Sequence, residues 1–455
     1  HNDAKSSIRK FLFQLCGHKD LRAARFYCLI KLHKTPVVGR PIASCINTTT
    51  LHASKYLDYK LQPFLQMIPS YLQSAQQLLV TLEEQSFPTR IVLVSADIEA
   101  LYPNIPIQAG LHALSEQLAH YGMKDNQRNF LVDLARFVLT NNYITFEGEH
   151  YLQISGTAMG TPFAVVFANL FLAYLERNLA ANTLADPYLF RRYIDDLFLI
   201  FSDRDSANSW LTAYQAAYPT INLTFKISEE SVNFLDLRIF KGARYRQRLI
   251  RKLDTELYAS STHKFLHLPP WSHHAKHTFS AFILAERKRI RLNCSRDADF
   301  AHWDKKYRRQ LLNRGHADDQ LEPLFLPELA RNQLLLKAVA ALQRYKDRKS
   351  AQLNPGLKPI RAINPLVFKV TYSSLSRRLH LRKILELSQH VAEDADSPLI
   401  FTPRCPIMCY KRNTNLGELL SQNASHNTDD NDDNDDNNNS TYPMGMGTQP
   451  PIPYG

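Results

Sequence analysis

Two adjacent carboxylates, Asp195 and Asp196, interrupt an otherwise apolar and aromatic stretch that runs from Tyr193 to Phe201. The residues on both sides favour strands, and a strand–turn–strand hairpin would place the two aspartates at its tip. Charges flanked so closely by core residues are costly to desolvate, so they need a partner such as a metal ion. Most isolated Asp-Asp pairs are plain β-turns, and a site is indicated only if further carboxylates join them.

A second carboxylate segment lies upstream. The run 90–97 is apolar almost throughout, as in a central strand of a sheet, and it ends in Asp97. If this strand neighbours the hairpin, three carboxylates converge. Two divalent ions held there roughly 4 Å apart can stabilise the attacking and leaving oxygens of a phosphoryl transfer. Mg²⁺ suits this role because it takes oxygen ligands and keeps substrate phosphates in its coordination shell.

A glycine-containing loop, Gly156–Gly160, lies between the two carboxylate segments and leads into an apolar helix expected over 163–178. Such a loop before a helix is usually a plain helix cap without a ligand. The order of a first aspartate, a loop with its helix and an Asp-Asp hairpin is nevertheless the order of the palm of a template-dependent polymerase. Each part indicates little alone, and the ordered set predicts phosphoryl transfer.

Hydrophobic periodicity predicts the elements that position these residues. Two short strands, 25–34 and 40–44, joined by a Pro/Gly turn, carry Lys31, Lys34 and Arg40 near that turn, although a solvated hairpin explains these cations equally well. A single strand is expected over 231–240. The other expected elements are helices over 50–65, 74–85, 107–120, 127–139, 206–218, 279–291 and about 374–387, and strands over 143–146, 151–154 and 221–228.

The composition favours a polyanionic partner. Lys and Arg outnumber Asp and Glu by 55 to 43, and six acidic residues lie in one run, Asp429–Asp436, so the rest of the chain is more basic than its net charge of +12 indicates. The six cysteines are scattered, as expected of reduced thiols in an intracellular protein. The longest apolar run, 163–175, is too short to span a bilayer, so no membrane role is expected.

Together these motifs resemble a reverse transcriptase, specifically the polymerase of a Penelope-like retroelement, a group related to telomerase reverse transcriptases. The agreement runs from about Phe26 to Leu420. The segments that carry it are Phe26–Lys34 with Arg40–Ile42 (fingers), Asp97–Pro106 (first palm motif), Gly156–Pro162 with Ala168–Asn169 (second palm motif), Tyr193–Asp196 (catalytic hairpin), Phe234–Asp236 and the histidine-rich segment that follows.

The resemblance implies an α+β, right-hand polymerase fold with fingers, a palm made of an antiparallel sheet backed by helices, and a mainly helical thumb. The expected regions are fingers over 1–89, a palm with the catalytic motifs over 90–240, a thumb and C-terminal nucleic-acid-binding region over 241–420, and a disordered low-complexity tail over 421–455. Many relatives carry a C-terminal GIY-YIG endonuclease. Nothing after Leu420 resembles one, so we expect an element without this nuclease or a truncated chain.

The resemblance also implies roles for single residues. The catalytic carboxylates that hold two Mg²⁺ ions, or Mn²⁺ in their place, would be Asp97, Asp195 and Asp196, with the Ile98 carbonyl as an extra metal ligand. Contacts to the incoming nucleotide would come from Lys31 and Arg40 at the triphosphate, Tyr102 at the ribose 2′ position, and Gln153, Gly156 and Gly160 beneath the nascent base pair. Nucleic-acid phosphates would be bound by Lys241, Arg244, Arg246, Arg248, His273, His274 and Lys276.

The expected function is that of an RNA-directed DNA polymerase, a nucleotidyltransferase that extends a DNA primer on an RNA template with deoxynucleoside triphosphates, made in the cytoplasm and acting in the nucleus. An RNA-dependent RNA polymerase shares the palm, but such enzymes usually place a second Asp shortly after the first, where this sequence has Leu101 and Tyr102. A co-opted nucleic-acid-binding protein without activity is the third reading. The presence of all three carboxylates, Lys31 and Arg40 argues against it.

Overall fold

The computed structural model describes residues 21–31, 37–180, 186–217, 220–260, 265 and 268–353, together with the backbone of 367–371 and 407–411. Contacts divide the chain into two compact units, His1–Pro359 and Ile360–Gly455. In the second unit, strands β12 (Val367–Thr371) and β13 (Ile407–Lys411) pair in parallel. The helix expected near 374–387 and the low-complexity tail lie outside the described residues.

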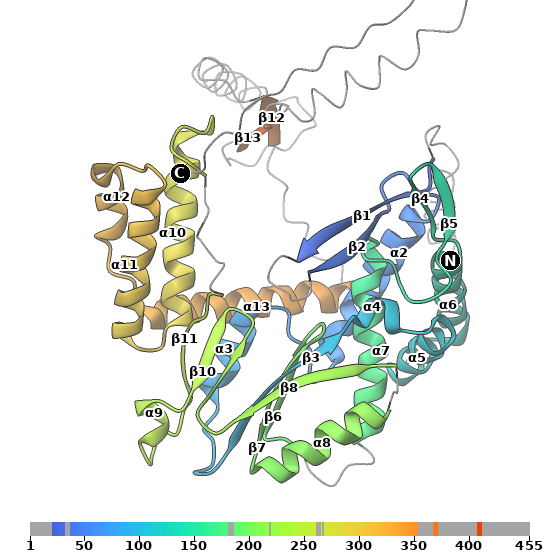
Figure 1. Ribbon diagram of the computed structural model, residues 1–455, viewed down its shortest axis with the longest axis horizontal. Coiled ribbons are helices and arrows are strands. Elements are labelled where there is room, and N and C mark those ends of the chain that lie inside the picture. The colour runs from blue at the N-terminus through green and yellow to red at the C-terminus, as the bar shows by residue number, and fades with distance from the viewer. Residues whose placement is uncertain are drawn as a thin grey trace, which may run out of the picture. The chain divides into compact units, whose positions relative to one another are not determined.

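A four-stranded antiparallel sheet forms the centre of the first unit, with the strand order β6-β7-β3-β8 (Figure 1). These strands are β3 (Val92–Glu99), β6 (Leu189–Tyr193), β7 (Asp196–Phe201) and β8 (Asn222–Ser228). Because successive side chains of a strand point to opposite faces, the apolar residues of β3 and β7 divide between two cores. The strand that was expected to end at Asp97 continues to Glu99, since Asp97, Ile98 and Glu99 still pair with β8.

Helices cover one face of this sheet. Val94 and Ile98 of β3 and Leu199 of β7 belong to the core that these helices share. Helix α7 is apolar on nearly all sides and lies between α2, α5 and α8, which explains its apolar sequence. The helices on this side are α2 (Leu51–Leu61), the 3₁₀ helix η1 (Gln62–Met67), α5 (Ile107–His120), α6 (Asp125–Thr140), α7 (Pro162–Ala180) and α8 (Arg204–Ala217).

The other face of the sheet packs on a second core. Leu93, Phe198 and Ile200 contribute to this core from the sheet. It also contains residues of α3 (Ala75–Glu84), β9 (Ser231–Phe234) and β10 (Leu237–Phe240), and β10 pairs with β11 (Asp254–Leu257). The single strand expected over 231–240 is therefore wrong. Leu235 has a φ of +53°, and the chain reverses there so that Phe234 pairs with Leu237.

A second sheet has the order β2-β1-β4-β5 (Figure 1). Its strands are β1 (Ala24–Lys31), β2 (Val38–Ser44), β4 (Tyr143–Phe146) and β5 (Glu149–Leu152). The β1–β2 and β4–β5 hairpins confirm the two hairpins expected from the sequence, and β1 joins them by pairing in parallel with β4. The turn at 32–36 lies outside the described residues.

The remaining described residues of the first unit are mainly helical. The helices are α9 (Ala243–Arg246), α10 (Lys276–Asn293), α11 (Asp297–Asn313), α12 (Asp318–Phe325) and α13 (Arg331–Leu353). Helices α10, α11 and α12 surround a core of their own, which includes Ile290, Tyr307 and Leu321. The long helix α13 joins this bundle to elements that pack on the sheet, since it contacts α10 as well as α3 and η1.

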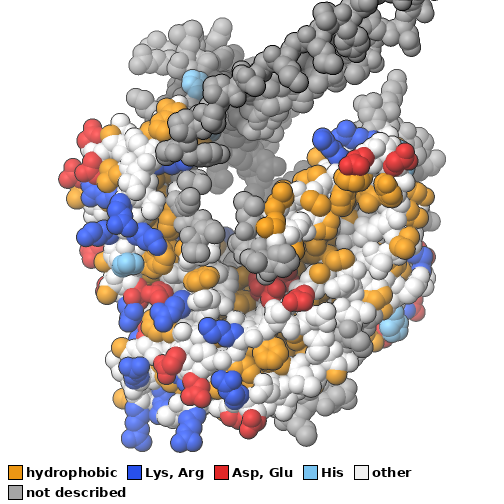
Figure 2. Space-filling view, viewed as in Figure 1, with side chains coloured by type: hydrophobic (Ala, Val, Ile, Leu, Met, Phe, Trp, Pro, Cys, Tyr) orange, Lys and Arg blue, Asp and Glu red, His pale blue; other side chains and the backbone are white. Residues whose placement is uncertain are grey.

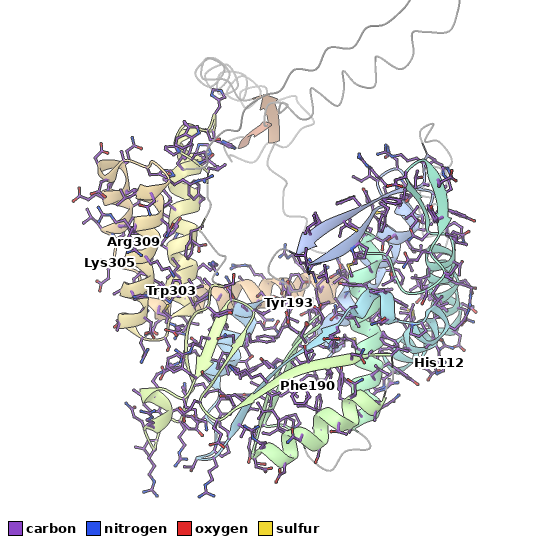
Figure 3. The ribbon with its side chains drawn as sticks, viewed as in Figure 1. His112, Phe190, Tyr193, Trp303, Lys305 and Arg309 are labelled. Atoms are coloured by element: carbon purple, nitrogen blue, oxygen red, sulfur yellow. The ribbon has the colours of Figure 1, made fainter. Side chains whose placement is uncertain are left out.

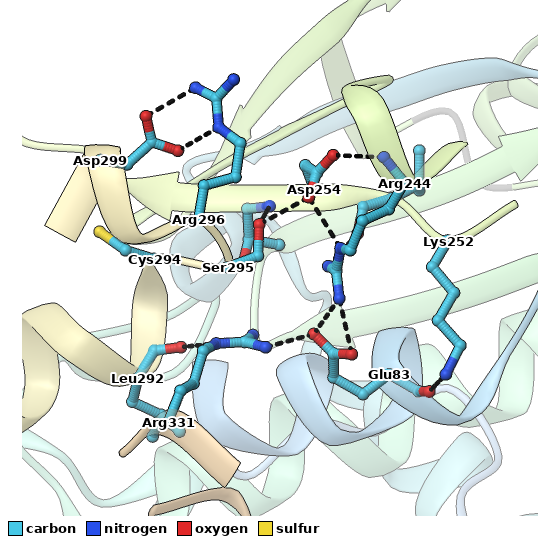
Figure 4. A network of polar contacts seen from close by, with 12 residues as sticks. Glu83, Arg244, Lys252, Asp254, Leu292, Cys294, Ser295, Arg296, Asp299 and Arg331 are labelled. Carbon is cyan, nitrogen blue, oxygen red and sulfur yellow. Dashed lines mark hydrogen bonds and ion pairs between the residues drawn. The ribbon is translucent and has the colours of Figure 1, made fainter. Parts of the chain in front are cut away.

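Partly buried ion pairs join α9 and α13 to α3 and β11 (Figure 4). Glu83 of α3 accepts hydrogen bonds from Arg244 at 2.9 and 3.0 Å and from Arg331 at 2.5 Å. Arg244 also donates to Asp254, whose side chain is fully buried. The two arginines hold the pKa of the Glu83 carboxyl below its usual value, against the effect of its burial. Paired and hydrogen-bonded, these charges stabilise one arrangement of α3, β11 and α13.

No helix in the described part of the chain combines the length and the hydrophobicity that a transmembrane span requires. Cys28, Cys45 and Cys294, the cysteines whose side chains are described, are all free thiols.

Candidate active site

The pairing of β3 with β7 sets Asp97 directly opposite Asp196. Asp97 lies four residues after Leu93 and Asp196 lies two residues before Phe198, so these aspartates share the face of Leu93 and Phe198. Their side chains therefore leave the sheet on the face opposite helices α5, α7 and α8. Asp195 lies in the two-residue turn that joins Tyr193 to Asp196. The N–H of Ile98 donates to the Asp195 carbonyl at 3.0 Å, which ties the turn to β3. The structure thus brings together the three aspartates that were expected to converge.

Their charges interact strongly. Burial, and then the charges of Asp195 and Asp97, raise the pKa of the Asp196 carboxyl to about 7. Burial also raises the pKa of the Asp195 carboxyl, while Arg40, Lys31 and Arg192 oppose this rise. Figure 2 shows acidic side chains gathered near the centre of the face that is turned to the viewer. Figure 3, in the same view, labels Tyr193 of the hairpin in this central region. Crowded carboxylates of this kind are relieved by a divalent cation.

The donor set fits magnesium. No three His, Cys, Asp or Glu side chains in the described ranges are placed so that they could hold a metal ion by themselves. Mg²⁺ is seldom bound in cages made by protein alone; it takes one or two carboxylates and completes its shell with water and substrate phosphates. Asp97, Asp195 and Asp196 supply only oxygen ligands at one end of a sheet, which suits an ion completed by a nucleotide. The Ile98 carbonyl would be an additional oxygen at the same end of β3.

The crowding predicts an unusual pH dependence of stability. The pKa of the Asp196 carboxyl is about 7 in the folded protein and about 3.8 in an unfolded chain. Between these two pH values the carboxyl is therefore protonated in the folded protein and ionised in the unfolded chain. The stability of the fold is therefore highest below the lower value and decreases as the pH rises through 7. In metal-free buffer we expect Asp196→Asn to unfold at a higher temperature than wild type at pH 8, and at a similar temperature near pH 4. Thermal unfolding followed by circular dichroism measures this, and an equal shift at both pH values would contradict it.

Two cations of the β1–β2 hairpin act electrostatically on Asp195. Leu29 pairs with Arg40 in this hairpin, so Arg40 and Lys31 lie diagonally on the same face of the sheet. Both lower the pKa of the Asp195 carboxyl, which places their charges within electrostatic reach of it. Lys31 and Arg40 were expected to contact a triphosphate, and this contact stays a prediction.

Tyr102 lies on the short helix α4 (Leu101–Asn104), which begins after Ala100, a residue with a φ of +49°. Burial raises the pKa of the Tyr102 hydroxyl to about 12, and the charge of Asp195 adds to this effect while Arg40 opposes it. The Tyr102 carbonyl accepts a hydrogen bond from the N–H of Thr157 at 2.9 Å. The Tyr102 hydroxyl is therefore close enough to Asp195 and Arg40 for their charges to affect it, and the Tyr102 backbone is joined to the glycine-containing loop.

The loop Gly156–Gly160 packs between α4 and strand β2 of the second sheet. At Gly156, φ is +71°, and an added Cβ would lie 2.5 Å from the Cα of Pro103. At Gly160, φ is +129°, and an added Cβ would lie 2.3 Å from the Ala43 carbonyl oxygen. Gln153 supports the start of the loop, since its side-chain amide donates to the Ser155 carbonyl at 2.8 Å and accepts from Asn142 at 2.7 Å. Its polar atoms thus hold the loop in shape.

A matched pair of glycines tests this requirement. Gly148 has a φ of +83° but open space where a Cβ would be. We expect Gly148→Ala to cost only the strain of a left-handed residue, about 1 kcal/mol of unfolding free energy. Gly160→Ala adds a backbone collision and should cost clearly more, with a loss of activity that Gly148→Ala does not share. Chemical unfolding of both variants gives the comparison, and equal losses would show that the close approach to Ala43 is unimportant.

The basic residues after Phe240 have different surroundings. The guanidinium of Arg244 is engaged with Glu83 and Asp254, so it holds the fold together. Arg246 and Arg248 are exposed. Lys241 is partly buried, lies 5.5 Å from the centre of the Tyr245 ring and has a pKa lowered by burial. Of the four, Arg246 and Arg248 are therefore the most accessible to a phosphate backbone.

These surroundings predict distinct effects on nucleic-acid binding. Replacing both Arg246 and Arg248 with Ala should flatten the dependence of log K on log salt by about 0.9 for each lost phosphate contact. Arg244→Ala should instead destabilise the fold by about 3 kcal/mol, because it leaves the buried carboxylate of Asp254 without its partner. Fluorescence anisotropy with a labelled duplex measures the slopes. An equal change of slope in Arg244→Ala would contradict the division of roles.

The histidine-rich segment lies at the start of α10. His273 and His274 are exposed, and Nδ1 of His274 is 2.9 Å from the Ser272 hydroxyl. Lys276 is the first residue of α10. The described geometry neither joins these residues to the carboxylates nor assigns them a ligand, and nucleic-acid contact at this segment stays a prediction.

One set of residues near the turn was not expected from the sequence. Arg192 is fully buried and contacts Glu176 and Asn169 of α7. Two features of the sequence hinted at this contact: a charged residue immediately before the apolar hairpin, and a glutamate and an asparagine on a helix that is otherwise apolar.

No protein-family model matches the chain, and no curated protein matches it. Similar solved structures include the telomerase from Candida albicans in complex with a TWJ fragment of telomeric RNA, at 10% identity and a TM-score of 0.49, covering 77% of this chain and 63% of that one. The RNA-dependent RNA polymerase of a human picobirnavirus matches at 12% identity and a TM-score of 0.46, covering 72% of this chain and 61% of that one. This chain spans less than two thirds of the length of either protein. Since both TM-scores lie below 0.5, a functional assignment has to rest on the residues of the site.

Proposed function

We propose that the chain is an RNA-directed DNA polymerase that adds deoxynucleotides to the 3′ end of a primer. One observation carries the proposal: Asp97 and Asp196 are paired across two central strands, and Asp195 lies in the adjoining turn, where the charges of Lys31 and Arg40 act to lower its pKa. Carboxylates that gather metal ions opposite cations that neutralise phosphates are the components that nucleotidyl transfer requires.

Each residue has a distinct part in this chemistry. Asp97, Asp195 and Asp196 would hold two Mg²⁺ ions, which stabilise the attacking primer oxygen and the leaving pyrophosphate when they are bound. Lys31 and Arg40 would neutralise the triphosphate and orient it. Arg40 can bind two phosphate oxygens at once through its planar guanidinium, whereas Lys31 acts as a single positive charge.

The nucleotide sugar and base would lie between the aspartates and the Gly156–Gly160 loop. The Tyr102 carbonyl accepts a hydrogen bond from Thr157, so the backbone of Tyr102 is joined to this loop. The ring would pack beneath the sugar and leave no room for a 2′-hydroxyl. The loop, held by Gln153, would form the floor under the base pair that is being made.

The sequence motifs favour a Penelope-like retroelement as the source of this polymerase. RNA would be the template and DNA the primer, and the duplex would be bound through its phosphates by exposed basic residues such as Arg246 and Arg248. A chain that acts on chromosomal DNA would work in the nucleus after synthesis in the cytoplasm.

A primer-extension assay with the purified chain tests the proposal. The same labelled DNA primer is annealed to an RNA and to a DNA template, and Mg²⁺ is supplied with either deoxynucleotides or ribonucleotides. We expect extension on the RNA template with deoxynucleotides. Preferential use of ribonucleotides would indicate an RNA-dependent RNA polymerase. Tight duplex binding without extension in Mg²⁺ or Mn²⁺ would indicate a nucleic-acid-binding protein without activity.

A further inference from the structure

Arg192 lies at the end of β6, three residues before Asp195, and its side chain is completely buried. The guanidinium donates from Nε to Glu176, from one terminal nitrogen to the Asn169 side-chain oxygen at 2.8 Å and to the Ile194 carbonyl at 3.0 Å, and from the other to the Asn169 carbonyl at 3.4 Å. A charge without solvent is stable only when it is paired and hydrogen-bonded, and these contacts meet both conditions.

The partners of Arg192 are themselves held in place. The second carboxylate oxygen of Glu176 accepts a hydrogen bond from the Ser70 hydroxyl at 2.5 Å. The Asn169 amide donates to the Val165 carbonyl at 2.9 Å within α7. The backbone of Arg192 is fixed as well, because its N–H donates to the Ser70 carbonyl at 2.6 Å and its carbonyl accepts from Leu72. The guanidinium is therefore a rigid donor with very little freedom to turn.

The turn that this donor contacts is strained. Ile194 has a φ of +56°, a conformation that a β-branched residue avoids and that a hairpin turn normally assigns to Gly or Asn. Such strain persists only when the surroundings hold it. Two hydrogen bonds fix successive peptide groups around Asp195: Arg192 holds the Ile194 carbonyl before it, and Ile98 holds its own carbonyl.

We propose that Arg192 is a positioning residue for catalysis: it holds the strained Ile194 peptide and so aims the Asp195 carboxylate at the nucleotide site. This inference rests on the proposed polymerase activity. A planar guanidinium suits the task because it reaches Glu176, Asn169 and Ile194 at fixed angles, which an ammonium group cannot do. The side-chain hydrogen bonds of Arg192 go to Glu176, Asn169 and Ile194, so it acts on Asp195 through the turn.

The test compares Arg192→Met with Arg287→Met. Arg287 is an equally buried arginine, 2% exposed, paired with Asp304 at 2.8 and 2.9 Å within the α10–α12 bundle. Both variants lose a buried ion pair and should lose stability. Only Arg192→Met is expected to lower kcat, by about 100-fold, as a displacement of roughly 1 Å at the reacting centre does. The KM for the nucleotide should change little in either variant.

A second readout does not depend on activity. Amide hydrogen exchange of Ile98 in metal-free protein reports whether the Asp195 carbonyl is still held, and we expect it to be faster by about tenfold to 100-fold in Arg192→Met, the effect of losing one hydrogen bond to a charged group. It should be unchanged in Arg287→Met. Unchanged exchange in a folded Arg192→Met protein would overturn the proposal whether or not the wild type polymerises nucleotides, so failure of this inference and failure of the proposed activity are distinguishable.

Arg192→Lys covers the case in which Arg192→Met does not fold. The lysine keeps the positive charge beside Glu176 but cannot hold Asn169 and Ile194 at the same time. We expect a folded variant that melts close to wild type, with faster Ile98 exchange and a reduced kcat. If Arg192→Lys shows wild-type exchange and wild-type kcat, the buried charge alone is what matters and the positioning role is wrong.

Discussion

Asp97→Asn and Asp195→Asn are each expected to reduce nucleotide addition at least about 1,000-fold, the size of effect seen when a group that stabilises developing charge is removed. Asn keeps the size of the side chain and loses the negative charge that binds a divalent cation. Binding of primer and template should remain within a few-fold of wild type, because affinity for a duplex comes mainly from cations at its phosphates. Single-nucleotide extension and duplex binding, measured on the same protein, separate the two effects.

Asp203→Asn is the matched control for these variants. Asp203 is a fully exposed carboxylate just before α8, and it accepts a hydrogen bond from the N–H of Ser206 at 2.8 Å. Asn caps a helix as well as Asp does, so this variant removes one negative charge and little else. We expect wild-type activity. If Asp97→Asn or Asp195→Asn retained near-normal addition in Mg²⁺, the two-metal assignment would be wrong.

Many of the strands and helices around the carboxylates were predictable because they depend on local patterns of apolar residues. A short run that is apolar almost throughout indicates a buried central strand, and β3 and β7 are such strands. The hairpin at Asp195 and the helices α5 and α7 were expected for similar reasons, and they lie within a few residues of their expected limits. From the sequence, the three carboxylates could form a site only if β3 lay next to the hairpin. The pairing of Asp97 with Asp196 shows that β3 and the hairpin are neighbours.

Features that depend on distant partners were not predictable. The reversal at Leu235 requires a positive φ that only the packing of β9 and β10 imposes, and an apolar residue gives no local signal for it. Arg244 was expected to bind nucleic-acid phosphates, yet Glu83, a residue 161 positions away, holds it in a structural network. The contacts of Arg192 were likewise not predictable, because they require that α7 lies next to the hairpin. In each case the deciding interaction joins segments that hydrophobic periodicity treats separately.

Tyr102→Ala should admit ribonucleotides while the metal chemistry survives. The ring is half-buried beside the aspartates, and Asp195 and Arg40 both influence its hydroxyl. It would exclude a 2′-hydroxyl by overlap, without any hydrogen bond, and a collision is relieved by shortening the side chain. We expect the ratio of kcat/KM for deoxynucleotide over ribonucleotide to fall by roughly 100-fold. Deoxynucleotide addition itself should weaken somewhat, because removing the ring leaves a void beneath the sugar.

Tyr102→Phe is the control for this prediction, since it removes the hydroxyl and keeps the ring. If steric overlap causes the discrimination, Tyr102→Phe should retain the wild-type ratio. The alternative is that Tyr102 only packs against the core, where it already adjoins the helices behind the sheet. In that case Tyr102→Ala would lower kcat/KM for both kinds of nucleotide equally and leave their ratio unchanged. The decisive quantity is therefore the ratio, compared across wild type, Tyr102→Phe and Tyr102→Ala. A wild-type protein that used ribonucleotides as readily as deoxynucleotides would refute DNA synthesis as the activity, whatever the variants did.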